Sequence, residues 1–446
     1  MLHLYLSPAF SLLFFIFLTY LLIKWLIFSN TKHKNLPPSP TKLPVLGNLH
    51  QLGSHPHCAL HRLSQQHGHL MMLHFGSMPV LAVSSTDAAR EIMKTHDSIF
   101  SNRPKLNITD KLLYEGKDIS TAPYGEYWRQ MKSICVLQLL SQKRVQSFQN
   151  IREEEVGFLI EDIRESCSLS SPVNLSKLFA SLTNDVVCRV AFGKKYRGGE
   201  NGKKFQELLE EFMKLLGSIN VGDFIPWLSW KEREMGMLQG ESKKNFVDIL
   251  LEIQKENKAG FAIHKDNIKA IILDMFAAGT DTTYSVLEWA MAELIRQPRV
   301  MQKLQNEVRG TANTKSLITE KDLDKMPYFK AVMKETEPAT FINAWAIGTD
   351  PMFWDEPEVF RPERFVNSSI DFKGHDFQLI PFGAGRRGCP GILFAMITNE
   401  LVIANLVNRF DWALPDNEMG EELDMTEWNG LITHKCVPLL AVATPT

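Results

Sequence analysis

A glycine-rich loop around Cys389 carries the residue types best suited to chemistry in this sequence. The segment 381–391 reads PFGAGRRGCPG, with three glycines in six positions and two arginines shortly before the cysteine. Such glycines indicate unusual backbone angles or close approach of the backbone to another group. Pro390 suits the first position of a helix, which the apolar stretch 392–410 supplies. Cys389 is therefore expected at a helix N-terminus, where free amides favour a thiolate that can bind a metal axially beside an anionic group.

The same loop has two other interpretations. Gly383, Gly385 and Gly388 match the dinucleotide-binding pattern GxGxxG, an apolar run at 377–382 precedes them, and Asp411 falls near the expected acidic position. The surrounding sequence does not alternate between strands and helices, which argues against a dinucleotide site. The other possibility is a buried, inert cysteine, the usual fate of an isolated cysteine. It leaves the glycines and arginines of the loop unexplained.

A second candidate site lies in the middle of the longest predicted helix. Its pattern runs from Asp266 to Gln297 and ends before Pro298. At about 1.5 Å per residue this helix exceeds roughly 40 Å and crosses a whole domain. Its centre at 278–283 reads AGTDTT, and glycine and clustered threonines are poor choices for a helix interior. Threonine hydroxyls can bend a helix by bonding back to its carbonyls, so we interpret this weak point as functional, with a tolerated irregularity as the alternative.

The elements that must position these two sites are mostly helices. Helical periodicity dominates after residue 85, and two short apolar runs near the start predict a hairpin that turns at Gly76–Ser77. No repeat or change in composition marks a second domain, so the sequence predicts one mainly α domain with a small β-sheet region. The predicted helices are 87–96, 125–140, 148–164, 203–216, 245–257, 266–297 and 392–410, and the predicted strands are 70–75 and 79–83.

Composition argues against several other classes of protein. The 446 residues are 44% hydrophobic and 22% charged, which is typical of a globular protein without a bias to disorder. The formal net charge of -2 and the lack of a basic tract with interleaved aromatic residues give no sign of nucleic-acid binding. The six cysteines include no CxxC pair, which argues against a zinc site or a disulfide scaffold and fits a reducing compartment.

Residues 1–30 are predicted to form a membrane anchor. An apolar run extends over 4–23, and about 20 apolar residues span a bilayer as a helix. A cleavable signal peptide is the alternative, but no Lys or Arg precedes the run, whereas Lys24, Lys32 and Lys34 follow it. The positive-inside rule then places the body in the cytosol, on a single-pass protein whose usual location is the endoplasmic reticulum membrane.

A proline-rich connector is predicted at residues 31–47. It contains LPPSP at 36–40, followed by Pro44 and Gly47. Prolines fix φ and remove N–H donors, so this segment is expected to be stiff and to set how the body, residues 48–446, stands off the membrane. A simple spacer is the alternative.

Taken together, these motifs resemble those of the cytochrome P-450 family, particularly its plant microsomal members. The loop matches FxxGxRxCxG, the helix centre matches A/G-G-x-D-T-T/S, and FRPERF at 360–365 matches the segment ahead of the loop in that family. Trp128-x-x-x-Lys132 matches the family's WxxxR position, with lysine for arginine. The motifs follow the family's order over nearly the whole chain. The matching residues of the loop and the helix centre are Phe382, Gly385, Arg387, Cys389, Gly391, Ala278, Gly279, Asp281, Thr282 and Thr283.

The resemblance implies a haem b cofactor whose iron is bound by the Cys389 thiolate, which pushes electron density toward oxygen to favour O–O cleavage. Asp281 and Thr282 would bend the long helix beside the oxygen site and relay protons to dioxygen. From the residues alone, a solvated helix charge for Asp281 and a back-bonded hydroxyl for Thr282 are the alternatives.

The resemblance also implies residues that hold the rest of the cofactor. Trp128, Lys132 and Arg387 would bind the haem propionates, a role that lysine fills only as a point charge. Phe382 would pack near the cysteine and tune its surroundings.

The reaction that the resemblance implies is a monooxygenation. One oxygen atom of dioxygen would be inserted into a small apolar metabolite, with plant secondary metabolism as the setting. The electrons would come from an NADPH-dependent cytochrome P-450 reductase. Lys132, Arg129 and Arg386 are candidate contacts for that reductase, and the lipid membrane is the other expected partner.

The chain departs from the family at its Glu-x-x-Arg motif, whose two residues bond in that family with the arginine of the PERF segment. Here Glu335 and Arg364 are present, but Pro338 stands in place of the motif arginine and ends the helix. A strand-rich stretch of the substrate pocket is missing after it, and a second shortening is expected around 230–242. Since breaking a buried charged network costs several kcal/mol, the alternative function is a catalytically impaired or dead membrane-bound relative.

Overall fold

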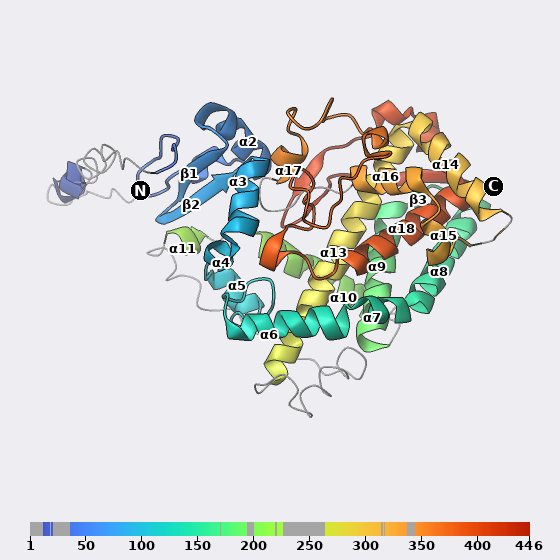
Figure 1. Ribbon diagram of the computed structural model, residues 1–446, viewed down its shortest axis with the longest axis horizontal. Coiled ribbons are helices and arrows are strands. Elements are labelled where there is room, and N and C mark those ends of the chain that lie inside the picture. Colours follow the sequence, from blue (N-terminus) through green and yellow to red (C-terminus); the bar gives the residue numbers. More distant parts are fainter. Residues whose placement is uncertain are drawn as a thin grey trace, which may run out of the picture.

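Helices make up most of the chain in the computed structural model, which describes residues 12–17, 19–20, 36–169, 171–193, 200–218, 221–225, 264–313, 315, 317–336 and 344–446. The strands form small antiparallel sheets in the orders β1-β2, β3-β7-β4 and β5-β6. The predicted mainly α fold with a small β-sheet region is confirmed, and strands also occur at the end of the chain. Figure 1 shows the β1-β2 hairpin at one end of the molecule and α14 and α15 at the other.

The helices are α2 (Pro56–His67), α3 (Thr86–Arg90), α4 (Asp97–Phe100), α5 (Asn107–Leu112), α6 (Glu126–Ile134), α7 (Gln142–Ser147), α8 (Gln149–Ser168), α9 (Leu175–Phe192), α10 (Glu200–Gly217), α11 (Val221–Phe224), α13 (Lys265–Arg296), α14 (Pro298–Ala312), α15 (Glu320–Leu323), α16 (Pro327–Thr336), α17 (Ala344–Gly348) and α18 (Ile392–Arg409). The strands are β1 (Leu70–Phe75), β2 (Met78–Val83), β3 (Val173–Asn174), β4 (Phe410–Ala413), β5 (Glu427–Asn429), β6 (Thr433–Lys435) and β7 (Leu440–Pro445).

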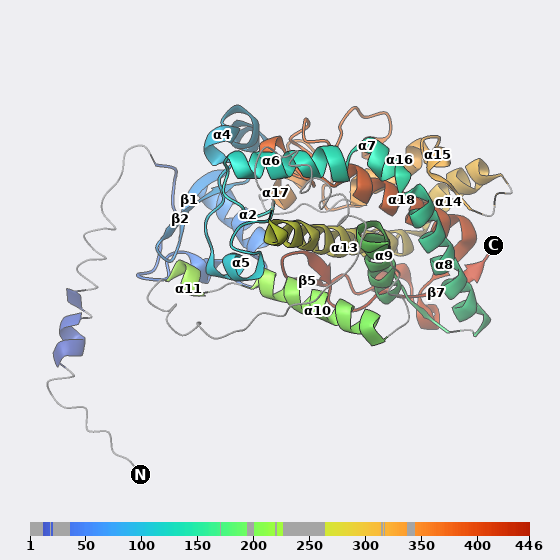
Figure 2. The ribbon, with the colours of Figure 1, turned by 90° about the horizontal axis from the view of Figure 1, so that it is seen from below.

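Helix α13 is the central element, and it runs through the middle of the helical layers (Figure 2). It packs against α9, α16 and α18, and its side chains Leu287 and Met291 are fully buried. The helix begins where Asn267 Oδ1 accepts a hydrogen bond of 2.7 Å from the His264 N–H, and it ends ahead of Pro298. The predicted helix 266–297 is therefore confirmed to within one residue at each end.

The predicted hairpin is also confirmed, with its turn at Gly76–Ser77. Gly76 has a φ of 57°, and a Cβ there would lie 2.1 Å from the carbonyl oxygen of Phe224, so this turn requires glycine. The proline-rich connector lies along the same hairpin, since the Met72 N–H donates to the Pro38 carbonyl at 2.8 Å.

Two predicted helices end in π-helical turns. The predicted helix 87–96 is α3 followed by a π-helical turn at 91–95, and 125–140 is α6 followed by one at 135–139. Such turns are rare and occur frequently at functional sites. The first one carries Met93 against the cysteine loop, where a Cβ on Gly385 would lie 1.9 Å from the Met93 carbonyl oxygen. The predicted helix 245–257 lies outside the described residues.

Within the described part of the chain, α18 is long and apolar enough to cross a membrane, but 72% of it is buried inside the fold, as in a core helix. Most of the predicted anchor, residues 1–30, lies outside the described residues. Its described residues, 12–17 and 19–20, are helical and exposed.

Two buried carboxyl groups lie where α13 meets the loop between α5 and α6. Asp274 is 8% exposed, and its Oδ2 accepts a hydrogen bond of 2.5 Å from the Ile119 N–H. Asp118 on the loop is fully buried and accepts from Ser120 Oγ at 2.5 Å and the Thr121 N–H at 2.6 Å. Burial, followed by repulsion from Asp118, raises the pKa of Asp274 from 3.8 to about 8. The folded state therefore holds this carboxyl protonated at neutral pH.

We expect this carboxyl to make the protein less stable as pH rises. Because the pKa of Asp274 is higher in the folded state than its ordinary value, its contribution is fully present at acidic pH and is lost as pH rises toward 8. The loss is at most about 1.4 kcal/mol per pH unit for a single group. Denaturant unfolding at about pH 6 and pH 8 measures it. In the Asp274→Asn variant the free energy of unfolding should lose this part of its pH dependence. An unchanged pH dependence would contradict the raised pKa of Asp274.

Candidate functional site

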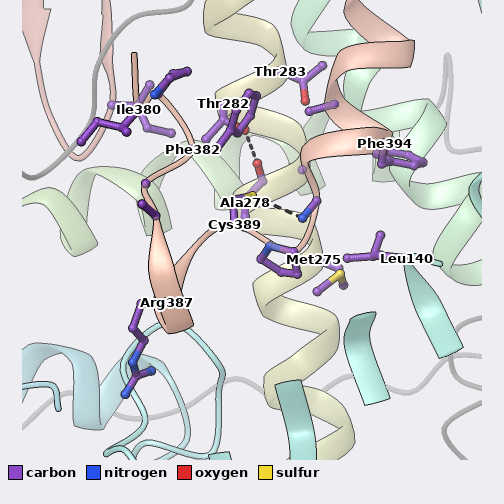
Figure 3. Close-up of a pocket in the computed structure, with 18 of the residues that line it drawn as sticks. Leu140, Met275, Ala278, Thr282, Thr283, Ile380, Phe382, Arg387, Cys389 and Phe394 are labelled. Atoms are coloured by element: carbon purple, nitrogen blue, oxygen red, sulfur yellow. Dashed lines mark hydrogen bonds between the residues drawn. The ribbon is translucent and has the colours of Figure 1, made fainter. Parts of the chain in front are cut away.

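A cavity of about 460 Å³ lies between the middle of α13 and the loop that carries Cys389 (Figure 3). Ala278, Gly279 and Thr282 line it from α13, facing Cys389 from the loop. The two predicted candidate sites, more than 100 residues apart in the sequence, are therefore two walls of one cavity. Apolar side chains form much of the remaining wall, including Ile92, Leu140, Val187, Val190, Met275, Val286, Ile380, Phe382, Phe394 and Ile432.

Hydrogen bonds from the loop backbone hold Cys389 at the cavity. The Cys389 N–H donates to the Phe382 carbonyl at 2.9 Å, and the Gly391 N–H donates to Cys389 Sγ at 3.3 Å. Phe382 itself lines the cavity. The prediction that Pro390 begins the helix is wrong, because α18 begins at Ile392 with Gly391 as its cap. A turn at Pro390 and Gly391 directs the Gly391 amide back to the sulfur, where it stabilises a thiolate.

The centre of α13 contains the irregular side-chain contacts that its glycine and threonines predict. Thr282 Oγ1 donates to the carbonyl of Ala278, one turn earlier (Figure 3), so the back-bonded alternative describes its hydroxyl in this structure. The buried hydroxyl of Thr283, which also lines the cavity, has no hydrogen-bond partner within the described part of the chain. A Cβ on Gly279 would lie 3.3 Å from Val187 Cγ2 on α9, so glycine permits close packing of the two helices.

Asp281 points away from this cavity. Its Oδ2 lies 3.1 Å from Nε2 of His434 on β6, and both side chains are mostly buried. His434 was not among the residues singled out from the sequence, because no local pattern connects it with a helix 150 residues earlier.

Three arginines line one end of the cavity: Arg103, Arg386 and Arg387. Arg387 donates to the carbonyls of Ser101 at 2.7 Å and Ala122 at 2.6 Å. Burial, followed by the charge of Arg103, lowers the pKa of Arg387 to about 10, so it remains cationic at neutral pH. Arg103 was missed in the sequence, since a single arginine in an irregular loop carries no pattern. A cluster of cations favours binding of an anionic group at this end.

Trp128 and Lys132 stand behind Arg387 rather than on the cavity wall. The Arg387 guanidinium carbon lies 4.2 Å from the centre of the Trp128 ring, and Trp128 Nε1 donates to the Ile119 carbonyl at 2.9 Å. Lys132 Nζ donates to the carbonyl of Gly388 in the cysteine loop. Burial lowers the pKa of Lys132. The structure thus brings Trp128, Lys132 and Arg387 together, with their donors directed to backbone carbonyls.

Glu335 and Arg364 form a shielded ion pair. Arg364 Nε lies 3.1 Å from Glu335 Oε2, and the two side chains are 11% and 9% exposed. Burial raises the pKa of Glu335, while the hydrogen bond from the Arg361 N–H and the charge of Arg364 oppose that rise. Pro338, at the position of the missing motif arginine, lies outside the described residues.

The sequence comparison agrees with this site. The model of the cytochrome P450 family matches residues 37–240, 230–336 and 339–437, which include the α13 centre and the whole cysteine loop. The chain belongs to the cytochrome P450 family. Members of this family are haem monooxygenases that receive electrons from a reductase, so this cytochrome P450 is an oxidoreductase.

Curated plant proteins are similar over nearly their full length. Cytochrome P450 736A117 of Prunus mume is 53% identical, and the match covers 99% of this chain and 96% of the relative. (+)-Menthofuran synthase of Mentha piperita is 47% identical, with 94% of each chain covered. A zebra fish cytochrome P450 solved with abiraterone has a TM-score of 0.74 at 24% identity, covering 88% of this chain and 100% of that one. This likeness shows the fold.

The family match is interrupted where the sequence predicts missing segments. One matched piece ends at residue 336 and the next begins at 339, while two pieces overlap at 230–240. The alignment with the Prunus mume protein has 505 positions, more than the 446 residues of this chain. That relative therefore contains residues within the aligned region that this cytochrome P450 lacks.

The cavity fits the haem that the family implies. The Gly391 amide donates to the Cys389 sulfur, apolar side chains form the walls, and Arg103 and Arg387 supply positive charge at one end. These are the features that a flat, apolar cofactor with an iron centre and two carboxylates requires. Gly383 lines this wall with a φ of 67°, and Gly385, with a φ of 65°, lets the loop pass close to the Met93 carbonyl.

Proposed function

We propose that this chain is a membrane-anchored monooxygenase that inserts one oxygen atom of dioxygen into a small apolar metabolite. The observation that carries the proposal is the position of Cys389 across one apolar cavity from Thr282 on α13. The similarity to a menthofuran synthase favours a small apolar substrate of plant secondary metabolism. Residues 1–30 would be the anchor in the endoplasmic reticulum membrane, 31–47 the connector and 48–446 the cytosolic haem-binding domain.

In this proposal haem b supplies the redox chemistry of dioxygen when it is bound, with electrons from an NADPH-dependent cytochrome P-450 reductase. Cys389 would bind the iron as a thiolate, and the Gly391 N–H would stabilise the charge on its sulfur. Phe382 lines the cavity beside the cysteine loop and would tune the surroundings of the cysteine. Arg387 and Arg103 attract the propionates.

Trp128 and Lys132 complete the propionate site by packing against Arg387 and the cysteine loop. On the opposite wall, the Thr282 hydroxyl handles the protons that dioxygen reduction consumes, together with the carboxylate of the adjacent Asp281, which lies behind the wall and faces β6. The apolar side chains of the wall exclude bulk water and bind the substrate.

An impaired relative is the second candidate, and the interrupted family match supports it. Glu335 and Arg364 would then hold the haem-binding core without the third member of their network. The two candidates differ in whether the protein binds haem and turns over.

Replacing Thr282 with alanine tests the proposed function. We expect product formed per NADPH consumed to fall roughly tenfold, with a rise in released hydrogen peroxide, because a group that handles protons is lost. The assay uses full-length protein with reductase in lipid vesicles. Thr311→Ala is the matched control, since Thr311 Oγ1 makes the same kind of bond to the Glu307 carbonyl at 2.9 Å on α14. Equal product yield in both variants would contradict the role of Thr282.

A further inference from the structure

The hairpin formed by β5 and β6 is fixed directly to the catalytic stretch of α13. Ser285 Oγ donates to the Thr433 carbonyl at 2.8 Å, and Trp289 Nε1, one turn further along, donates to the same oxygen at 3.1 Å. Ile432, immediately before β6, lines the cavity. Figure 2 shows β5 of this hairpin close to α10 and α13. The hairpin is therefore held in register with the helix beside Asp281.

His434 on this hairpin directs its imidazole at Asp281. Nε2 of His434 lies 3.1 Å from Asp281 Oδ2, and the side chains are 12% and 20% exposed. A carboxylate only accepts hydrogen bonds, so this nitrogen carries the proton and donates. Asp281 and Thr282 are adjacent in sequence, yet the Thr282 side chain faces the cavity while the carboxylate faces β6.

The imidazole is itself fixed in place. It stacks on the Tyr284 ring with 5.0 Å between ring centres and 19° between the planes. Its Nδ1 is buried without a hydrogen-bond partner among the residues that the structure describes. The polar contact of the ring is therefore the one between Nε2 and Asp281. An unpaired buried ring nitrogen lowers the free energy of unfolding. A histidine at this position therefore indicates a role other than stabilising the fold.

The nearby charged side chains, Glu288 and Lys435, have hydrogen-bond partners other than Asp281. Glu288 Oε1 accepts from Tyr284 Oη at 3.3 Å, and its Oε2 accepts from the Lys435 N–H at 3.4 Å. Lys435 Nζ donates to the Asp424 carbonyl. The donor from His434 is therefore the feature that sets the orientation of the Asp281 carboxylate.

We propose that His434 is a positioning residue that holds Asp281 beside Thr282 in the orientation needed for proton handling. The inference rests on the proposed function, in which Asp281 takes part in oxygen reduction. Without the imidazole donor the carboxylate can rotate to other rotamers, and a displacement of about 1 Å at a reacting group can lower a rate 100-fold.

The stoichiometry of two reactions separates proton handling from a general structural role. In the NADPH-driven reaction, a substrate C–H bond, dioxygen, NADPH and one proton are converted to the alcohol, water and NADP⁺. With cumene hydroperoxide, substrate C–H and the hydroperoxide give the two alcohols, and no external proton or electron is consumed. A defect in proton handling lowers the first rate selectively, whereas a distorted cavity lowers both.

The test compares both rates in His434→Leu and His434→Gln, with ethoxycoumarin as the probe and full-length protein in lipid vesicles with reductase. We expect the ratio of NADPH-driven to hydroperoxide-driven oxidation to fall roughly tenfold in His434→Leu. It should stay near that of the unmodified chain in His434→Gln, whose amide can still donate to Asp281. Cys436→Ser, at an exposed position two residues further along, is the control. An unchanged ratio in His434→Leu, or an equal fall in both His434 variants, would overturn the inference.

Asp281→Asn distinguishes failure of this inference from failure of the proposed function. If Asp281→Asn leaves the ratio unchanged, the proposed role of Asp281 is wrong and the inference falls with it. If Asp281→Asn lowers the ratio and His434→Leu does not, the inference alone is overturned.

Thermal unfolding supplies a readout that needs no turnover of the probe. We expect the double variant of Asp281→Asn and His434→Leu to lower Tm no further than the more damaging single variant, because both changes remove the same contact. Additive shifts in Tm would show that the two side chains are not coupled and would overturn the proposal, even if neither reaction oxidises ethoxycoumarin.

Discussion

Serine in place of Cys389 is expected to abolish monooxygenase activity. A serine hydroxyl remains protonated at neutral pH, so it cannot replace the thiolate that the Gly391 amide stabilises at 3.3 Å. The substitution is nearly isosteric and leaves the hydrogen bond from the Cys389 backbone to Phe382 intact. The fold should therefore survive while the iron ligand is lost. Product formation with NADPH and reductase is the measurement, with circular dichroism to verify folding.

The controls for this change are other cysteines. Cys58 and Cys436 are exposed and lie outside the cavity, so Cys58→Ser and Cys436→Ser should keep full activity. Activity that persists in Cys389→Ser, or that is lost equally in the controls, would be incompatible with Cys389 as the iron ligand.

Alanine in place of Arg364 is expected to destabilise the fold by about 3–5 kcal/mol, because it leaves the shielded Glu335 carboxylate without its cation. Arg364 also donates to the carbonyls of Asp355 at 2.7 Å and Val359 at 2.7 Å, which ties the PERF segment to the loop before it. With Pro338 in place of the motif arginine, Arg364 is the cation available to Glu335 among the described residues. The free energy of unfolding in denaturant measures this effect.

Arg361 is a matched control three residues away. It pairs with Asp355 and Glu356, but its side chain is 44% exposed, and exposed ion pairs contribute about 0–1 kcal/mol. Arg361→Ala should therefore cost far less than Arg364→Ala. Similar losses of unfolding free energy in the two variants would contradict the stabilising effect expected from burial of the Glu335–Arg364 pair.

The parts of the site encoded by neighbouring residues could be predicted from the sequence. The glycines, arginines and cysteine of the 381–391 loop occur within 11 positions, and the long apolar period of α13 identifies that helix without ambiguity. The start of α18 at Ile392 was predicted as well, but the assignment of Pro390 to its first position was wrong, because a turn at Pro390 and Gly391 and the first turn of a helix have similar sequence requirements.

The parts built from distant residues could not be predicted. Arg103 reaches the cavity from an irregular loop, and His434 reaches Asp281 from a short strand, and neither position shows a periodic pattern. The shared burial of Asp118 and Asp274 likewise depends on tertiary packing. The π-helical turn at 91–95 arises where α3 meets the cysteine loop, which local helix propensity does not encode.

The central claim is that Cys389 binds haem iron in this shortened chain, and the carbon monoxide spectrum of the reduced protein tests it most directly. Full-length protein purified in detergent is reduced with dithionite and exposed to carbon monoxide. We expect the strongly red-shifted Soret band of thiolate-bound haem, and we expect it to disappear in Cys389→Ser. Folded, soluble protein that shows no such band with haem present would contradict the claim and would favour the impaired relative.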